Sequence, residues 1–145
     1  LLPYLEKELQ GLIEAVLRSG RTPVLFTSRG ELHFGSGEAA AELRLIFGMQ
    51  LARVMARLVA RLVPQLGYLI SKGGITTGTL LRDGFNLSSV DLEGQLLPGL
   101  SLVLAMVGAD HSAEFSTALP VVTFPGNLGD PETLRQAWLM MEEGD

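Results

Sequence analysis

The feature that most constrains the fold of this chain is a long segment without helix-breaking residues. From Glu38 to Val63 there is no proline and a single glycine, Gly48. On a helical wheel its polar side chains fall within one arc of about 140°, and the remaining arc is almost wholly apolar, with Arg44 as the exception. A helix with so wide an apolar face is expected to lie against a sheet or a partner domain, and Pro64 marks its expected end.

Shorter segments on both sides of this helix alternate between helical and strand patterns. Because 145 residues is the length of one domain, the order predicts an α/β fold: a single three-layer domain with a mostly parallel or mixed sheet and helices on its faces. The last helix has the favoured start, with Asp130 as N-cap before Pro131. Besides the long helix, the pattern predicts helices at residues 5–17, 79–84 and 131–141. It predicts strands at residues 23–27, 67–71, 90–92, 100–107 and 119–124.

Composition excludes several classes of protein. The net charge of −5 argues against binding nucleic acid through general electrostatics. The chain has no cysteine, which removes disulfides, cysteine metal sites and thiol catalysis, and fits a reducing, cytoplasmic compartment. The longest nearly apolar run, Leu100–Ala109, is half of the roughly 20 residues that a membrane-spanning helix needs, so we expect a soluble protein without a membrane partner. His33 and His111 lack metal-ligand spacing, so no metal site is predicted.

Small and hydroxylated residues follow three of the predicted buried strands. In open α/β sheets, ligands bind beyond the carboxyl ends of the strands. The middle segment, Ser71–Gly78, has two adjacent glycines that let backbone approach a ligand, two threonine hydroxyls, the charge of Lys72 and the start of a helix, where amides favour an anion. It predicts a phosphate site, although a plain strand-to-helix turn would use the same glycines. The other two segments are Thr27-Ser28-Arg29 and Pro125–Gly129.

Two further patterns offer alternatives. Gly35–Ala40 has the G-x-G-x-x-A spacing of an NAD-type dinucleotide site, yet its predicted acidic partner would fall inside the long helix, near Arg57, and the same glycines serve as a helix N-cap. Arg53, Arg57 and Arg61 form an i, i+4 stripe that suits either a solvated helix face or contact with an anion or a partner.

Three strings in order carry a family resemblance: Ile70–Thr77, Gly94–Gly99 and Phe124–Asp130. With the upstream helix that leads to Thr27-Ser28-Arg29, they resemble the C-terminal, nucleotide-binding domain of the four-carbon acid sugar kinases. Members of that family are bacterial enzymes that phosphorylate threonate, erythronate or related keto-acids with ATP. The resemblance covers nearly the whole chain, so residues 1–145 are expected to form the nucleotide-binding half of a two-domain kinase whose N-terminal, sugar-binding domain is absent.

The resemblance also implies which residues contact ATP. It places the contacts on Ser28, on Gly73, Gly74, Ile75 and Thr76, and on Gly126, and the local reasoning adds Lys72, Thr77 and Asn127. Magnesium is implied as the partner of ATP, without a protein ligand that can be named, and no catalytic residue is assigned.

One departure from the family concerns Ile75, which stands where many members carry an acidic residue. A non-catalytic regulatory domain of the same fold is therefore a third interpretation. Because the sugar acid would bind mainly to the missing domain, we expect the isolated chain to turn over nothing. The sequence leaves open which sugar acid is used and whether the domain forms a homodimer.

Overall fold

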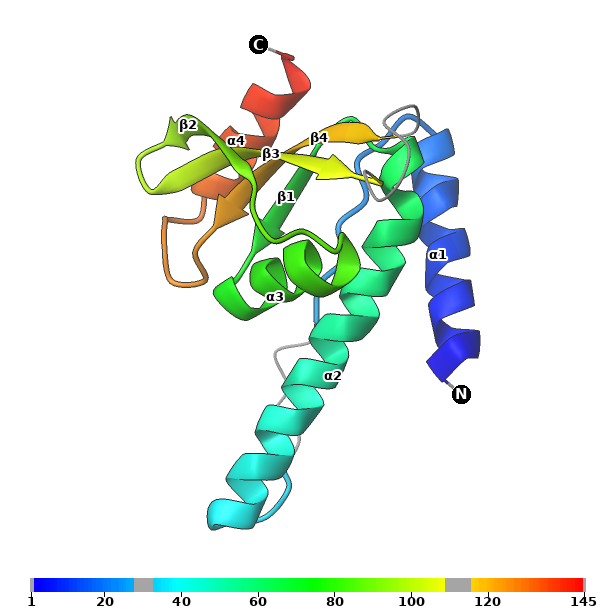
Figure 1. Ribbon diagram of the computed structural model, residues 1–145, viewed down its shortest axis with the longest axis vertical. Helices are drawn as coiled ribbons and strands as arrows, with labels where there is room; N and C mark the ends of the chain where they lie inside the picture. The colour runs from blue at the N-terminus through cyan, green and yellow to red at the C-terminus, as the bar shows by residue number, and fades with distance from the viewer. Residues whose placement is uncertain (1, 28–32, 109–115, 145) are drawn as a thin grey trace.

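The computed structural model describes residues 2–27, 33–108 and 116–144. Within these ranges the predicted helices are present, and four of the five predicted strands are present as well (Figure 1). The elements are α1 (Leu2–Arg18), α2 (Glu38–Leu62), a short 3₁₀ turn η1 (Val63–Gln65), β1 (Leu69–Lys72), α3 (Gly74–Thr79), a π-helical turn η2 (Leu80–Gly84), β2 (Asp91–Leu97), β3 (Leu100–Val107), β4 (Thr117–Phe124) and α4 (Thr133–Glu142).

The four strands form one sheet in the order β1-β4-β3-β2. β1 pairs with β4 in parallel, whereas the β4–β3 and β3–β2 pairs are antiparallel. The α/β class predicted from the sequence is confirmed, and the sheet takes the mixed form of that prediction. The parallel pair has a direct consequence for the site, because β1 and β4 end at the same edge of the sheet.

Both faces of the sheet are covered, which gives the predicted three layers. Alternate residues of a strand point to opposite faces, so Val121 packs among side chains of α2, η1 and η2, while Val122 packs on the side of α4 with Leu100 and Ala137. Val121 and Val122 are fully buried. Burial of each such side chain stabilises the fold by roughly 1.5–3 kcal/mol, so the middle of β4 belongs to the most strongly fixed part of the molecule.

An ion-pair cluster attaches α1 to α2. The carboxylate of Glu6 is almost completely buried and accepts one hydrogen bond from Arg57 at 2.5 Å, while Arg61 lies 3.2 Å from its other oxygen. The hydrogen bond from Arg57 lowers the pKa of Glu6 below its ordinary value, against the opposing effect of burial. Two members of the arginine stripe thus have a partner inside the chain instead of facing only solvent; Arg53 is exposed.

The predicted strand Pro23–Thr27 is wrong. The segment is extended but pairs with no strand, and the side chains of Val24 and Phe26 are 72% and 78% exposed. Its apolar composition favours burial, yet the described part of the chain supplies no surface to cover it. Thr22, the residue before this segment, is bound to α4. The Trp138 indole donates a hydrogen bond to the Thr22 hydroxyl, which in turn donates to the Glu142 carboxylate.

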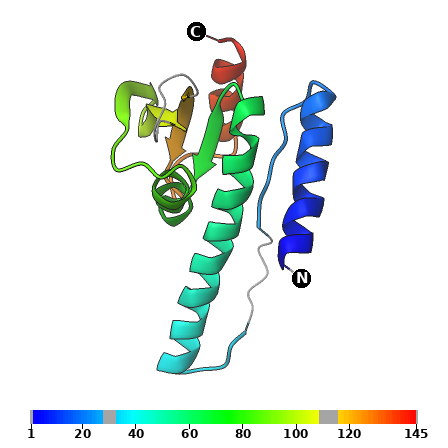
Figure 2. The same cartoon turned by 45° about the vertical axis from the view of Figure 1, so that its right-hand side comes forward.

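The apolar face of α2 is covered along only part of its length. Residues 52–62 alternate buried and exposed positions against the sheet, but residues 41–50 are all exposed. In Figure 2 this half of α2 extends past the sheet. The expected contact with a sheet is therefore present at the C-terminal half of the helix alone.

The last helix starts slightly later than predicted. The Asp130 carboxylate accepts a hydrogen bond from the backbone N–H of Glu132 at 2.9 Å, and this bond holds the pKa of Asp130 below its usual value. The Asp130 side chain thus closes the turn formed by Pro131 and Glu132, and the regular helix begins after it at Thr133, with Glu132 at the N-cap position in place of the predicted Asp130.

Candidate functional site

Two of the three predicted ligand segments meet at the edge where β1 and β4 end. Lys72 and Phe124 are the last paired residues of the two strands, and the N–H of Gly73 donates to the carbonyl of Phe124 at 2.8 Å. Beyond this bond the two turns lie against each other: a Cβ atom at Gly126 would stand 3.8 Å from the Cα of Gly73. Two turns that are more than 50 residues apart in the sequence therefore form one surface.

The first of these turns is built for close approach to backbone amides. Gly73 has φ +105°, a conformation that favours glycine, and α3 begins directly after it. The first turn of a helix leaves its N–H groups without intrahelical acceptors, and the amide of Thr77 donates to the carbonyl of Gly73. A Cβ atom at Gly74 would meet nothing within 4 Å. The surface above these amides is open, so an anion can reach them.

The two threonines of the turn have different environments. The hydroxyl of Thr77 is buried and lies 2.8 Å from that of Ser71, and it also donates to the Ser71 carbonyl at 3.3 Å. This pair fixes α3 to the end of β1. Thr76 is half-buried, and its Oγ1 lies 3.7 Å from the position that a Cβ atom of Gly73 would occupy. Of the two predicted hydroxyl donors, Thr76 therefore faces the turn and Thr77 supports it from below.

Lys72 holds the second turn in place. Its Nζ donates to the carbonyls of Pro125 and Gly126, both at 3.2 Å, and lies 4.1 Å from the centroid of the Phe124 ring. An ammonium group carries three N–H donors, so one donor and the positive charge are left beside the turn. Because strand side chains alternate, Lys72 lies on the face opposite Ser71 and the buried threonine.

A groove of about 300 Å³ opens between α2 and the first turn of α3. Thr27 reaches it from the third predicted segment; Ser28 lies outside the described residues. Ile75 and Thr76 line it from α3, and seven residues line it from α2. The α2 residues are Arg44, Leu45, Gly48, Met49, Leu51, Ala52 and Met55. The sequence analysis does not predict these α2 residues as part of a site. The one pattern that could have indicated them is the single charged residue, Arg44, within the apolar arc of the helix.

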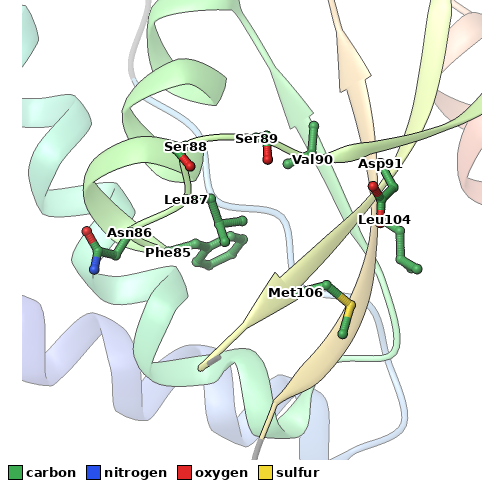
Figure 3. A pocket seen from close by; sticks show the side chains of 9 residues that line it. All are labelled: Phe85, Asn86, Leu87, Ser88, Ser89, Val90, Asp91, Leu104 and Met106. Carbon is green, nitrogen blue, oxygen red and sulfur yellow. The ribbon is translucent and has the colours of Figure 1, made fainter. Parts of the chain in front are cut away.

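A second pocket, of about 370 Å³, lies at the other end of the α3–η2 segment (Figure 3). Its polar groups are Asn86, Ser88, Ser89 and Asp91, so its one charged side chain is a carboxylate and it has no cation. None of the predicted site residues lines it. This chemistry does not suit a phosphate, and we assign the pocket no role in nucleotide binding.

The described residues contain no group of three or more His, Cys, Asp or Glu side chains that could hold a metal ion. Ile75 is exposed beside the turn and offers no oxygen ligand. The described residues therefore supply no such cluster for magnesium. Among the described helices, none is long and apolar enough to cross a membrane.

Comparison with known proteins bears directly on this surface. Residues 4–134 match a family model described as the nucleotide-binding C-terminal domain. The chain belongs to this family, the nucleotide-binding C-terminal domain of the four-carbon acid sugar kinases. The resemblance seen in the three sequence strings is thereby confirmed, and the α3 turn and the β4 turn lie within the matched residues. Among curated proteins, none matches the sequence.

Solved structures support the same fold. A domain of unknown function from Bordetella bronchiseptica, solved with bound citrate as a domain-swapped dimer, is 21% identical over 92% of this chain, with a TM-score of 0.63. A second crystal form of that protein gives 22% identity over 90% of this chain and a TM-score of 0.58. The chain spans about 30% of the length of these relatives.

Proposed function

We propose that this domain binds ATP and serves as the nucleotide-binding half of a kinase that phosphorylates a four-carbon sugar acid of the threonate or erythronate type. The observation that carries the proposal is the direct contact between the α3 turn and the β4 turn at one sheet edge. Family membership supports the nucleotide. The sugar acid comes from the resemblance of the three sequence strings to the kinases.

In this proposal the phosphates bind the open first turn of α3. The free amides of Gly74, Ile75 and Thr76 donate to phosphate oxygens, and the Thr76 hydroxyl adds a further donor. Gly126 and Asn127 form the facing wall, and Gly126 has no side chain to narrow the space.

Lys72 contributes to the same phosphate site by holding that facing wall and by placing its charge near the phosphates. The family resemblance adds Ser28, which follows Thr27 in the sequence. Thr77 acts as a positioning residue through its bond to Ser71.

Phosphoryl transfer depends on holding the nucleotide and the acceptor in line, with the developing charge stabilised. This chain supplies the nucleotide side of that arrangement. Because it spans about 30% of the solved relatives, the acceptor side would come from a preceding domain, and we expect the isolated chain to transfer nothing. Magnesium is expected to arrive with ATP. Since the described residues form no metal site, no step is assigned to it.

A cytoplasmic location and a homodimer remain predictions. The exposed apolar half of α2 favours a further contact, and the Bordetella relative was solved as a domain-swapped dimer. Light scattering on the intact protein should therefore give the mass of two chains, and the mass of one chain would contradict the dimer.

Thermal unfolding with different nucleotides tests the choice of ligand. ATP or ADP at 100 times its dissociation constant should stabilise the domain by about 2.7 kcal/mol, and NAD should have no effect. Stabilisation by NAD alone would favour the dinucleotide alternative, although the described residues before α2 form no strand to support it.

Transfer of labelled phosphate from ATP to a panel of four-carbon sugar acids, measured with the intact protein, tests the kinase activity. Transfer to one of these acids supports the proposal. Binding of ATP without transfer to any acid would favour the regulatory alternative, which the exposed Ile75 in place of an acidic residue suggests.

A further inference from the structure

The groove between α2 and α3 is continuous with the proposed phosphate site. Ile75 and Thr76 belong to the first turn of α3, and both also line the groove. Figure 1 shows α3 beside the middle of α2. Because Ile75 and Thr76 belong to both surfaces, a ligand with phosphates on the α3 amides can extend into the groove.

The walls of the groove suit a flat apolar group. Met49, Met55 and Ile75 present flexible or branched apolar side chains to it, and methionine sulfur makes favourable contacts with aromatic rings. Gly48 opens the wall of α2, because it has no side chain and a Cβ atom there would meet nothing within 4 Å. A volume of about 300 Å³ is at the lower end of the range for small-ligand pockets.

One positive charge stands at the rim of this apolar groove. Among the described residues Arg44 has no ion-pair or hydrogen-bond partner, whereas Arg57 and Arg61 bind Glu6. Lys72 is held by two carbonyls of the other turn. A guanidinium group binds phosphate oxygens and stacks on aromatic rings, so Arg44 has the chemistry to contact either the base or the phosphates of a nucleotide.

We infer that the groove holds the nucleoside part of the nucleotide whose phosphates bind the α3 turn, and that Arg44 contacts the nucleotide at its rim. The inference rests on the proposed function, since it takes the phosphate position from there. It adds α2 to the binding site and assigns the base to a surface that is formed by apolar side chains and one arginine.

Filling the groove tests this inference. Gly48→Leu places a side chain into the groove from an unstrained helical position, and leucine is the better helix former. The matched control is Gly11→Leu, since Gly11 lies within α1 and its Cβ position is equally open. In titration calorimetry on the intact protein, ATP should bind Gly48→Leu at least tenfold more weakly than wild type, and Gly11→Leu within twofold.

The second variant reverses the charge at the rim. Arg44→Glu should weaken ATP binding at least tenfold, and Arg53→Glu, an exposed change on the same helix away from the groove, should weaken it less than threefold. Both positions are exposed, so the variants are expected to fold, which circular dichroism checks. Wild-type affinity for ATP in a folded Gly48→Leu or Arg44→Glu protein would overturn the inference and leave the proposed function standing. A wild-type protein that binds no ATP at millimolar concentration would overturn both.

Discussion

Gly74→Val separates a phosphate site from a simple turn. In the structure Gly74 opens α3, its Cβ position is free of contacts, and its backbone is not in the left-handed region. Valine is a slightly better helix residue than glycine, so the free energy of unfolding should change by less than about 0.5 kcal/mol. The branched side chain would stand over the open amides and block phosphate from them. Loss of one charge-assisted hydrogen bond costs about 1.5–3 kcal/mol, so affinity for ATP should fall at least tenfold.

Titration calorimetry gives the affinity, and urea denaturation gives the stability of the same protein. The neighbouring change Gly73→Ala is the contrasting control. Gly73 has φ +105°, so alanine there should cost about 1–3 kcal/mol of stability through backbone strain. A folded Gly74→Val protein with the ATP affinity of the wild type would show that the glycines only form a turn, and the phosphate assignment would be refuted.

Three further changes test the contacts that support the site and the fold. Lys72→Met removes the ammonium group that holds the β4 turn, so the free energy of unfolding should drop by about 1 kcal/mol. An unchanged free energy of unfolding in urea denaturation would show that Lys72 does not hold the turn in solution. Glu6→Gln should destabilise the protein at neutral pH, where the ionised carboxylate binds Arg57. Because that bond lowers the pKa of Glu6 below its ordinary value of 4.5, the difference from wild type should begin to shrink below this pH and vanish once the pH is below the lowered pKa. A gap that is the same at every pH would contradict this. Gly84→Ala would place a Cβ atom 2.9 Å from the carbonyl oxygen of Ala56, so we expect the free energy of unfolding to fall by about 1–3 kcal/mol. An unchanged melting temperature would refute the close packing of η2 on α2.

The parts of the fold that follow local patterns could be predicted from the sequence. The long helix ends at Leu62, just before the expected stop at Pro64, and strands β3 and β4 lie within two residues of their predicted bounds. The apolar composition of Pro23–Thr27 predicts a buried strand, whereas the segment is extended and unpaired among the described residues. Composition records what a segment favours, but a strand also needs a neighbouring edge with which to pair.

The site shows the same division between local and tertiary information. Adjacent glycines before a helix indicate an anion site from sequence alone, and the parallel pairing that brings Gly126 to Gly73 agrees with the expected convergence of strand ends. The partners of Lys72 could not be predicted, because a shift of one residue in strand register turns a side chain to the other face. The part of α2 in the groove was equally hidden, since it depends on how two helices pack.

The most direct test of the central claim is to map the ADP contacts by amide NMR on the isotopically labelled protein. If the nucleotide binds where β1 and β4 end, the largest shifts on adding ADP should fall on the amides of 73–77 and 126–127. Largest shifts among residues 85–91, around the pocket of Figure 3, or no response to ADP at saturating concentration, would contradict the account.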